Sequence, residues 1–359
     1  RSVPDMKSKA EKIMSIVSPH EAVLLTCEQS LRWLSGFSFT DGYAVVTDSR
    51  CFLFADFRYI EAARAKVKPP VEVVLLSHGQ AHAEEVFNKS GTELVMYEDK
   101  YMTCADFSKW EKRFPDITFR GGSERIDKFR EFKDEDELKL IISAQRIAEK
   151  AYTHILDFIN PHRTETEVAL ELEYFMRHEG ATGVAFETIA VSGRASSQPH
   201  GVPRNIPLEP GFLTMDYGAE VDGYRSDMTR TVCIGHADEK MKHVYETVLR
   251  AQTAAEDMIR AGVLCRDADK TARDIIAAEG YGDCFGHSLG HGVGLFIHEN
   301  PRLSPGSGES VLSPGHVVTV EPGIYIEGQF GVRIEDMVYI QEDGSSRNLT
   351  NCPKGLVEL

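Results

Sequence analysis

Paired cysteines, long apolar runs and an excess of positive charge are all missing from this chain. Its 7 cysteines are scattered singly with no CxxC pair, so the sequence indicates neither a disulfide framework nor a structural zinc site. No apolar run approaches the roughly 20 residues of a membrane helix, and the opening RSVPDMKSKAEK contains no apolar signal core. We therefore expect a cytoplasmic protein with no membrane partner; a signal removed from the start is an open alternative.

The charge balance narrows the range of partners. There are 40 Lys and Arg against 56 Asp and Glu, which gives a formal net charge of −16. Such a protein repels a phosphate backbone, so we expect no nucleic-acid partner, whereas a cationic substrate is compatible with the charge. The 359 residues exceed the roughly 250 to 300 at which single hydrophobic cores stop growing, so we predict two domains.

The first domain is predicted over residues 1–125 as a small α/β domain. Short apolar runs alternate with amphipathic stretches at residues 59–67 and 101–114, a pattern typical of alternating strands and helices. A junction is predicted at Gly121-Gly122-Ser123 and the charged run up to Glu137, where the apolar periodicity is lost. The predicted strands cover residues 22–26, 43–47, 51–55, 71–77, 93–97 and 117–120.

The second domain, residues 132–359, is predicted to be α+β. A helix that includes Leu138 ends at Asn160-Pro161, and Thr164 with Glu167 forms a capping-box pattern that opens another. Further helices are expected over residues 238–261 and 267–279. Because the acids and histidines lie in strand and loop segments, we expect the chemistry on an antiparallel sheet.

Asp216 and Asp227 flank a strong hairpin signal, Asp222-Gly223. If these two residues form the turn, Asp216 faces Thr229, and Asp227 lies diagonally on the same face, roughly 7 to 8 Å away. Two aspartates at this separation can share a pair of metal ions about 3.5 to 4 Å apart.

Glu321 and Glu335 form a second pair, centred on Gly328. Opposed residues of a hairpin project to one face, so these glutamates also converge, whereas a one-residue slip in register would separate them. For any single acid, a solvated hairpin position is the simpler interpretation. Here the flanking segments are apolar, and four buried carboxylates need cations to offset their desolvation and repulsion.

Glycine-rich loops hold the candidate histidines. The segment GHSLGHGVGLFIHE places His287, His291 and His298 among glycines, which let the backbone pass close to a ligand or another strand. In one extended strand, His291 and His298 would face opposite sides unless a bulge intervenes, and different roles are expected for them. His200 lies on a Pro- and Gly-flanked loop. Imidazoles near a scissile carbonyl can stabilise an oxyanion and transfer protons, although each histidine alone could be structural.

These residues make a metallohydrolase the leading hypothesis. Four carboxylates and one imidazole can hold two divalent metal ions. This oxygen-rich set favours Mn(II), Co(II) or Fe(II), with Mn(II) first, over a closed thiolate zinc site, and Zn(II) is a further candidate.

The chain resembles the pita-bread metallopeptidases, and in particular their aminopeptidase P and prolidase branch. The family's ligand order of Asp, Asp, His, Glu and Glu is matched here, and the flanks SDMTRT, GHGVG, VEPGIY and GVRIED are similar to the family's. SLRWLSGF and ADFRY resemble the N-terminal domain of this branch. The resemblance therefore covers nearly the full length and implies an α/β domain followed by a pita-bread domain. The matched ligands are Asp216, Asp227, His291, Glu321 and Glu335.

The resemblance also assigns roles to these ligands. It implies that Asp227 and Glu335 bridge both ions, that Asp216 chelates one ion, and that His291 with Glu321 completes the other. Glu321 would also assist proton transfer from the bridging water.

Other residues are implied to act around the substrate. His200, His287 and His298 would surround the substrate carbonyl and the proline, and Arg333 would brace the carboxylates. Arg302 is a candidate anchor for a substrate carboxylate or, equally, a plain surface arginine.

The implied activity is two-metal hydrolysis of the Xaa-Pro bond at the N-terminus of short peptides, by a homodimer. The alternative within enzymes is an Xaa-Pro dipeptidase, although LSGF and ADFRY favour the aminopeptidase. A non-catalytic peptide-binding or protein-binding module is the alternative from another class. Its expected mark is the loss of a metal ligand, and none is lost in this sequence.

Overall fold

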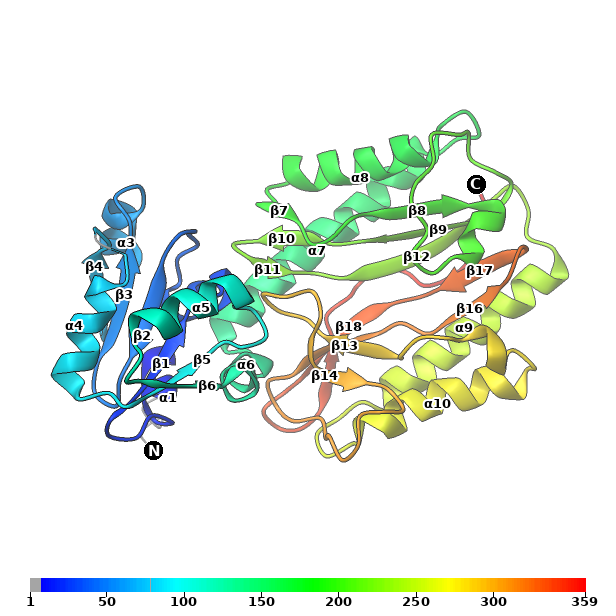
Figure 1. The fold of residues 1–359 in the computed structure, drawn as a ribbon. Helices are drawn as coiled ribbons and strands as arrows, with labels where there is room; N and C mark the ends of the chain where they lie inside the picture. The colour runs from blue at the N-terminus through cyan, green and yellow to red at the C-terminus, as the bar shows by residue number, and fades with distance from the viewer. Residues whose placement is uncertain (1–7, 78) are drawn as a thin grey trace. The chain divides into compact units, whose positions relative to one another are not determined.

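The computed structural model describes residues 8–77 and 79–359. Residues 1–7, which belong to the segment without an apolar signal core, lie outside this range. The chain divides into two compact units between Arg130 and Glu131. Each unit has its own sheets and helices (Figure 1).

The N-terminal unit is built on one six-stranded mixed sheet with the strand order β4-β3-β2-β1-β5-β6. Strand β1 pairs antiparallel with β2 and parallel with β5, so the chain crosses over between strands, as expected for an α/β unit. The six predicted strands are confirmed. They are β1 (Glu21–Leu25), β2 (Tyr43–Val46), β3 (Cys51–Ala55), β4 (Val71–Leu75), β5 (Leu94–Tyr97) and β6 (Thr118–Gly121).

Two helices of this unit confirm the amphipathic stretches, and others were not predicted. Helix α6 forms in the charged run where we expected a junction without apolar periodicity, and its Ile126 is buried. The described helices are α1 (Lys9–Met14), α2 (Glu28–Ser35), α3 (Ile60–Lys66), α4 (Ala81–Ser90), α5 (Cys104–Arg113) and α6 (Ser123–Glu131).

Helix α2 shows why some helices escaped prediction. Its N-cap residue, Cys27, makes no side-chain capping bond. Instead, the buried Glu98 carboxylate accepts the backbone N–H groups of Thr26 and Cys27 at 2.7 and 2.8 Å. A carboxylate at a helix N-terminus is stabilising. The cap comes from a residue beyond β5, so no local pattern marks the start of this helix.

The C-terminal unit contains two pairs of long helices. Asp134 caps α7 and Thr164 caps α8, and each forms a complete capping box with the acid three residues later. The predicted helices and the Thr164 capping box are therefore confirmed. The helices are α7 (Glu135–Phe158), α8 (Glu165–His178), α9 (Glu239–Met258) and α10 (Cys265–Ala278).

The strands of this unit pair antiparallel throughout the described sheets. The two main sheets have the orders β12-β9-β8 and β14-β13-β15-β18-β19, beside the smaller sheets β11-β10-β7 and β16-β17. The strands are β7 (Gly183–Val184), β8 (Ile189–Ser192), β9 (Gly211–Tyr217), β10 (Ala219–Val221), β11 (Tyr224–Arg225), β12 (Met228–Ile234), β13 (Gly290–Gly292), β14 (Glu299–Leu303), β15 (Val317–Val320), β16 (Gly323–Ile326), β17 (Phe330–Arg333), β18 (Asp336–Ile340) and β19 (Ser346–Asn348).

The C-terminal unit is built from two similar halves. Helices α8 and α10 run from Glu165 to His178 and from Cys265 to Ala278, so equivalent residues share their last two digits. Just before each helix, an isolated antiparallel bridge joins Thr164 to Pro207 in the first half and Leu264 to Val311 in the second. In Figure 1, α7 and α8 lie beside β8 and β9 of the first half, and α9 and α10 lie beside the strands of the second half. This relation was not visible in the sequence.

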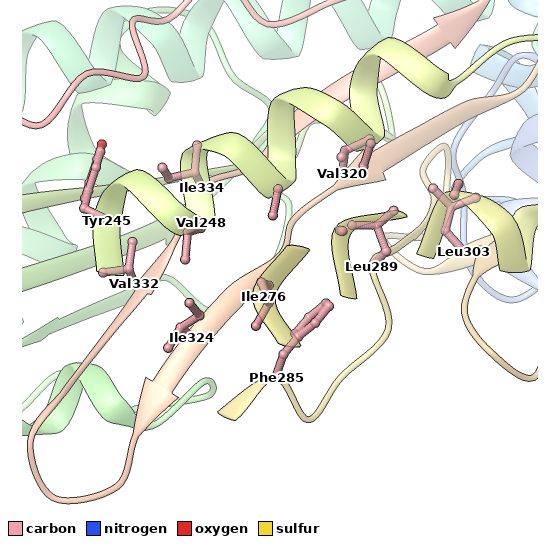
Figure 2. Packing of buried hydrophobic residues seen from close by; sticks show 14 of the residues in the cluster. Tyr245, Val248, Ile276, Phe285, Leu289, Leu303, Val320, Ile324, Val332 and Ile334 are labelled. Atoms are coloured by element: carbon pink, nitrogen blue, oxygen red, sulfur yellow. The ribbon is translucent and has the colours of Figure 1, made fainter. Parts of the chain in front are cut away.

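The core of the second half fixes the second hairpin. Tyr245 and Val248 of α9 pack with Ile324, Val332 and Ile334 in one buried cluster (Figure 2). Burying such side chains stabilises the fold by roughly 25 cal/mol for each Å² of apolar surface removed from water.

No helix in the described part of the chain combines the length and apolar character needed to cross a membrane.

Candidate metal centre

The first hairpin places Asp216 and Asp227 as predicted. Asp222 and Gly223 have φ values of 49° and 85°, and Asp216 pairs with Thr229. Asp227 lies in a break between β11 and β12. At this break a Cβ on Gly218 would lie 1.9 Å from the Ser226 carbonyl oxygen, so only glycine lets the strands approach.

The second hairpin keeps the same strand register before and after Glu321 and Glu335. Val320 pairs with Asp336 before the break, and Gly323 pairs with Arg333 after it. Glu321 and Glu335 fall between these pairs and line the same cavity, so the predicted register is confirmed. Gly328, with φ of 68°, lies at the turn.

His291 joins the acids from β13. Its Nε2 lies 3.1 Å from Glu321 Oε1 and 3.6 Å from Asp227 Oδ2. One ligand atom each from Asp227, His291 and Glu335 lie within 4.8 Å of one another. All five predicted ligands line one cavity of about 350 Å³.

The backbone around His291 orients its ring. A Cβ on Gly290 or Gly292 would lie 2.0 or 2.2 Å from a neighbouring carbonyl oxygen, so the strands pack here without side chains. The His291 Nδ1 lies 3.1 Å from the Gly292 carbonyl. A carbonyl only accepts, so Nδ1 carries the proton and Nε2 directs its lone pair toward the carboxylates. A metal ion, or in its absence a second proton on Nε2, would therefore lie between the ring and these carboxylates.

The donor set fits divalent metal ions. Asp216 Oδ1 and Glu335 Oε1 are buried without a hydrogen-bond partner, although buried polar atoms normally have one. Burial, followed by repulsion from neighbouring acids, raises the pKa of Asp227 and Glu335 well above the usual range. Cations at the orphaned oxygens would relieve both penalties.

Glu321 is the exception among the acids. Burial opposes its ionisation, but the hydrogen bond and charge of His291 outweigh burial and lower the pKa of Glu321 to about 2. The Thr319 hydroxyl also donates to Glu321 Oε1 at 3.1 Å. In the metal-free site, Glu321 is therefore the acid that most readily stays ionised.

Arg333 braces the opposite side of the site. Its Nη2 donates to Asp216 Oδ2 at 2.6 Å, and its Nε donates to the Thr229 hydroxyl at 3.1 Å. That hydroxyl donates to Glu335 Oε2 at 2.7 Å. The Arg333 Nη1 donates to the Tyr325 hydroxyl at 2.8 Å. The arginine thus connects the first hairpin to the second.

Thr229 and Tyr325 were missed as site residues. Pairing with Asp216 already placed Thr229 beside the acids, so the predicted register contained the signal. Tyr325 pairs with Gly331, whose Cβ would lie 2.8 Å from the Tyr325 ring. A glycine opposite a tyrosine in a predicted hairpin is the sequence signal that could have identified it.

A second arginine clamps the hairpins from behind. The buried Arg230 donates to the carbonyls of Thr229 and Glu335 at 2.9 and 2.6 Å. It also donates to Asp336 Oδ1 at 2.7 Å. The two segments that carry metal-site acids are therefore held to one guanidinium.

His287 and His298 take different places. The Nδ1 of His287 lies 2.8 Å from the Ser288 carbonyl and its Nε2 lies 2.9 Å from the Tyr325 hydroxyl. Burial lowers its pKa, so the neutral ring donates to the carbonyl and accepts from the tyrosine. Burial also lowers the pKa of His298, to about 4.

His291 and His298 lie on the same side of the site, as expected if a bulge interrupts the strand. Their ring centroids are 4.3 Å apart and nearly perpendicular. The two histidines do not share one extended strand, because the chain turns between β13 and β14 and a register shift interrupts the pairing. They therefore meet at the same site.

Two cavities meet at the metal centre. The apolar cavity, of about 350 Å³, is bounded by Phe186, Ile189, Val202 and Ile297 beside the acids. The polar cavity, of about 320 Å³, includes the predicted His200, His287, His298, Arg302 and Arg333. Both cavities share His200, His298 and three of the ligands. Every predicted site residue therefore lines at least one of them, and Arg302 does so as an exposed side chain.

Comparison with known proteins gives matches along most of the chain. The model of metallopeptidase family M24 matches residues 139–342, and that of the creatinase/prolidase N-terminal domain matches residues 11–132. The sequence is 37% identical over 356 residues to the Xaa-Pro dipeptidase of Pyrococcus horikoshii, which covers 98% of this chain and 99% of that protein.

Solved structures agree with these matches. An Xaa-Pro dipeptidase from Bacillus anthracis has a TM-score of 0.93 and 40% identity, covering 98% of this chain and 99% of its own. An X-Pro aminopeptidase from Thermotoga maritima MSB8 has a TM-score of 0.89 and 35% identity, covering 98% and 100%.

Proposed function

This chain belongs to metallopeptidase family M24, and from that premise we propose that it hydrolyses the Xaa-Pro bond at the N-terminus of short peptides. The chain is a hydrolase with the predicted fold, an α/β unit followed by an α+β pita-bread unit. The observation that carries the proposal is the convergence of four acids and His291 on one cavity.

Five side chains would hold two divalent ions. Asp227 and Glu335 would bridge the ions, Asp216 would bind one, and His291 with Glu321 would bind the other. When bound, the ions polarise a carbonyl and lower the pKa of a water molecule. The oxygen-rich donor set supports Mn(II) as the native metal, ahead of Co(II), Fe(II) and Zn(II).

The surrounding residues would handle protons and orient the substrate. Glu321, a carboxylate beside the metal ions, would accept a proton from the attacking water. His298, with a pKa of about 4, is neutral and can hydrogen-bond the developing oxyanion. His200 lines both cavities and would lie beside the scissile carbonyl. The proline nitrogen would leave protonated.

The two cavities suggest how a peptide lies across the site. The apolar cavity would take the side chain before proline, and the polar cavity would take the proline and any residues after it. Arg302 lines the polar cavity and could bind a terminal carboxylate. This position favours the second candidate, an Xaa-Pro dipeptidase, because only a dipeptide has its carboxylate next to the proline ring.

A kinetic panel tests the proposal. The protein is stripped with EDTA, reloaded with Mn(II), Co(II) or Zn(II), and assayed on an Xaa-Pro dipeptide, an Xaa-Pro-Pro tripeptide and an Xaa-Ala dipeptide. We expect metal-dependent cleavage of the proline peptides only. Preference for the tripeptide identifies an aminopeptidase, and preference for the dipeptide identifies a dipeptidase. No metal-dependent cleavage of any Xaa-Pro peptide would favour the binding-module alternative.

Assembly and compartment complete the proposal. We propose a homodimer, supported by the exposed Leu170 and Tyr174 on one face of α8, since exposed apolar patches mark interaction surfaces. We propose a cytoplasmic location, supported by the fact that the 7 cysteines are all free. Sedimentation at several concentrations tests the dimer, and cell fractionation tests the location.

A further inference from the structure

A buried acid outside the metal centre organises one end of the apolar cavity. Glu165, the first residue of α8, is 0% exposed and lines neither cavity. Its Oε1 accepts the backbone N–H and the hydroxyl of Ser192, the last residue of β8, at 2.7 and 2.8 Å. A buried carboxylate needs a cation or several donors, because its desolvation costs free energy.

Arg204 supplies the cation. Its Nε and Nη2 donate to the two oxygens of Glu165 at 2.9 and 2.6 Å, which is a forked, two-point pairing. The Arg204 backbone N–H also donates to Glu165, at 2.9 Å. Nη2 reaches Glu209 at 2.9 Å as well. Although burial opposes ionisation of Glu165, the hydrogen bonds from Arg204 and Ser192 together outweigh it and lower the pKa of Glu165.

This ion pair joins two walls of the apolar cavity. One wall consists of residues 186–189, which lead into β8 and therefore toward Ser192. The other wall consists of residues 200–203, which directly precede Arg204. Glu165 is hydrogen-bonded to Ser192, at the end of the strand that follows the first wall, and to Arg204, which follows the second wall. It therefore links the two walls at a fixed separation.

The loop wall carries exposed side chains and is held at its ends. Val202 is 78% exposed, so packing contributes little to its position. Before His200, the Pro199 carbonyl accepts a hydrogen bond from Arg333 at 3.3 Å. After Pro203, Arg204 is bound to Glu165. Backbone N–H groups of Thr166 and Glu165 also donate to the carbonyls of Arg204 and Ile206, at 3.2 and 3.3 Å. Loss of the ion pair would therefore loosen this end of the segment.

The second half of the unit does not repeat this pair. The bridges of Thr164 with Pro207 and of Leu264 with Val311 align Glu165 with Cys265 and Arg204 with Gly308. There, Arg266 donates to the exposed Glu309 instead. Residues 304–312 line neither cavity. In the described part of this unit, the equivalent loop of the second half therefore forms without a buried ion pair. Among these described residues, the pair is present only in the first half, where the loop lines the cavity.

We propose that Arg204, fixed by Glu165, is a positioning residue that sets the separation of the two cavity walls and thereby holds His200 and Val202 at the metal centre. The consequence for turnover rests on the proposed peptidase function. The consequence for the loop does not, because it concerns only the mobility of residues 198–206.

The test compares Arg204→Gln with a matched variant of the other half, Arg266→Gln. Both remove one arginine that pairs with an acid at a helix-to-loop junction. Arg204→Lys restores the charge but not the fork, and Glu209→Gln removes only the exposed part of the pairing. Each Mn(II)-loaded protein is measured for thermal unfolding, bound metal, amide hydrogen exchange of residues 198–206, and kcat and KM on an Xaa-Pro dipeptide.

We expect Arg204→Gln to keep its metal and its folded state while residues 198–206 exchange faster. Its kcat/KM should fall by about 10-fold to 100-fold, because small displacements of groups around a substrate have effects of that size. Arg204→Lys should recover part of the loss, Glu209→Gln should lose less, and Arg266→Gln should match the wild type.

Unchanged exchange of residues 198–206 in a folded Arg204→Gln protein would overturn the proposal. Equal exchange and kcat/KM in Arg204→Gln and Arg266→Gln would do the same, as would a loss of bound metal that accounts for the lost activity. If Arg204→Gln does not fold, Arg204→Lys and Glu209→Gln decide by the same readouts. If the wild type cleaves no Xaa-Pro peptide, the proposed function fails, and hydrogen exchange alone still decides the role of Arg204.

Discussion

The two halves of the C-terminal unit share a backbone plan but present different chemistry. Val191 of β8 pairs with Thr214 of β9, and His291 of β13 lies opposite Thr319 of β15 by the register of the neighbouring pair. Two residues after each threonine comes an acid, Asp216 in the first half and Glu321 in the second. The repeat thus supplies one carboxylate from each half. The strand paired with each threonine carries Val191 in the first half and His291 in the second, so only Glu321 has an imidazole beside it.

The neighbours set the two acids apart. Burial raises the pKa of Asp216 even though Arg333 opposes the shift. For Glu321, burial is outweighed by His291, and the pKa falls to about 2. Two acids at equivalent places therefore differ in the direction of their pKa shifts, because one faces an imidazole. A symmetric scaffold can carry an asymmetric site when single positions in the repeat diverge.

Removing a ligand that both metal ions would share should have the largest expected effect. Asp227→Asn and Glu335→Gln should each abolish peptidase activity and lower bound metal, because each acid would contact both ions. Elemental analysis with an Xaa-Pro assay measures this, and circular dichroism verifies folding. Glu327→Gln, at the exposed turn of the second hairpin, is the control and should behave as wild type. Two ions per chain in either ligand variant would contradict the bridging roles.

Removing the arginine that joins the two halves behind the metal site should have the next largest effect, a loss of stability. Arg230 and Asp336 are each 1% exposed in their side chains, and Arg230→Ala leaves a buried acid with one cation fewer. We expect a loss of about 3 to 5 kcal/mol in the free energy of unfolding, measured by urea denaturation. Arg250→Gln, which removes a surface ion pair with Glu279, should have a much smaller effect. Equal losses in the two variants would show that Arg230 does not clamp the hairpins.

Removing the cation beside Asp216 should sharpen the difference between the acids. Arg333→Gln removes the donors to Asp216, Thr229 and Tyr325. Groups that orient metal ligands typically contribute 10-fold to 100-fold in affinity or activity, so we expect a loss of about that size in Mn(II) affinity. Calorimetric titration of the metal-free protein measures it, with Arg266→Gln as the control. An unchanged affinity would mean that Arg333 does not brace the metal site.

Local patterns predicted the scaffold and the register of the acids. Alternating apolar residues marked the strands of the N-terminal sheet, and two turn signals placed Asp216 opposite Thr229 and Glu321 near Glu335. These features depend on residues close together in the sequence. For the same reason, the helix α8 and its cap at Thr164 could be read directly.

Contacts between distant segments could not be predicted in this way. Glu98 caps α2 from beyond another strand, and Arg204 pairs with Glu165 across a helix, a strand and a loop. The approach of His298 to His291 depends on a turn that brings β14 back beside β13. Each of these contacts is set by tertiary packing, which leaves no periodic pattern in the sequence.

The smallest expected effect tests the repeat at its helix starts. The Thr164 hydroxyl accepts the Glu167 backbone N–H at 3.1 Å, whereas Leu264, the equivalent residue before α10, makes no side-chain capping bond. Thr164→Ala should therefore lower the free energy of unfolding by about 1 kcal/mol. Leu264→Thr should raise it by less, because the Asp267 N–H is already bonded to the Leu264 carbonyl at 2.9 Å. Urea denaturation of the two variants measures both changes. If Leu264→Thr gains as much as Thr164→Ala loses, the two helix starts are interchangeable, and their difference is only the side chain at the cap.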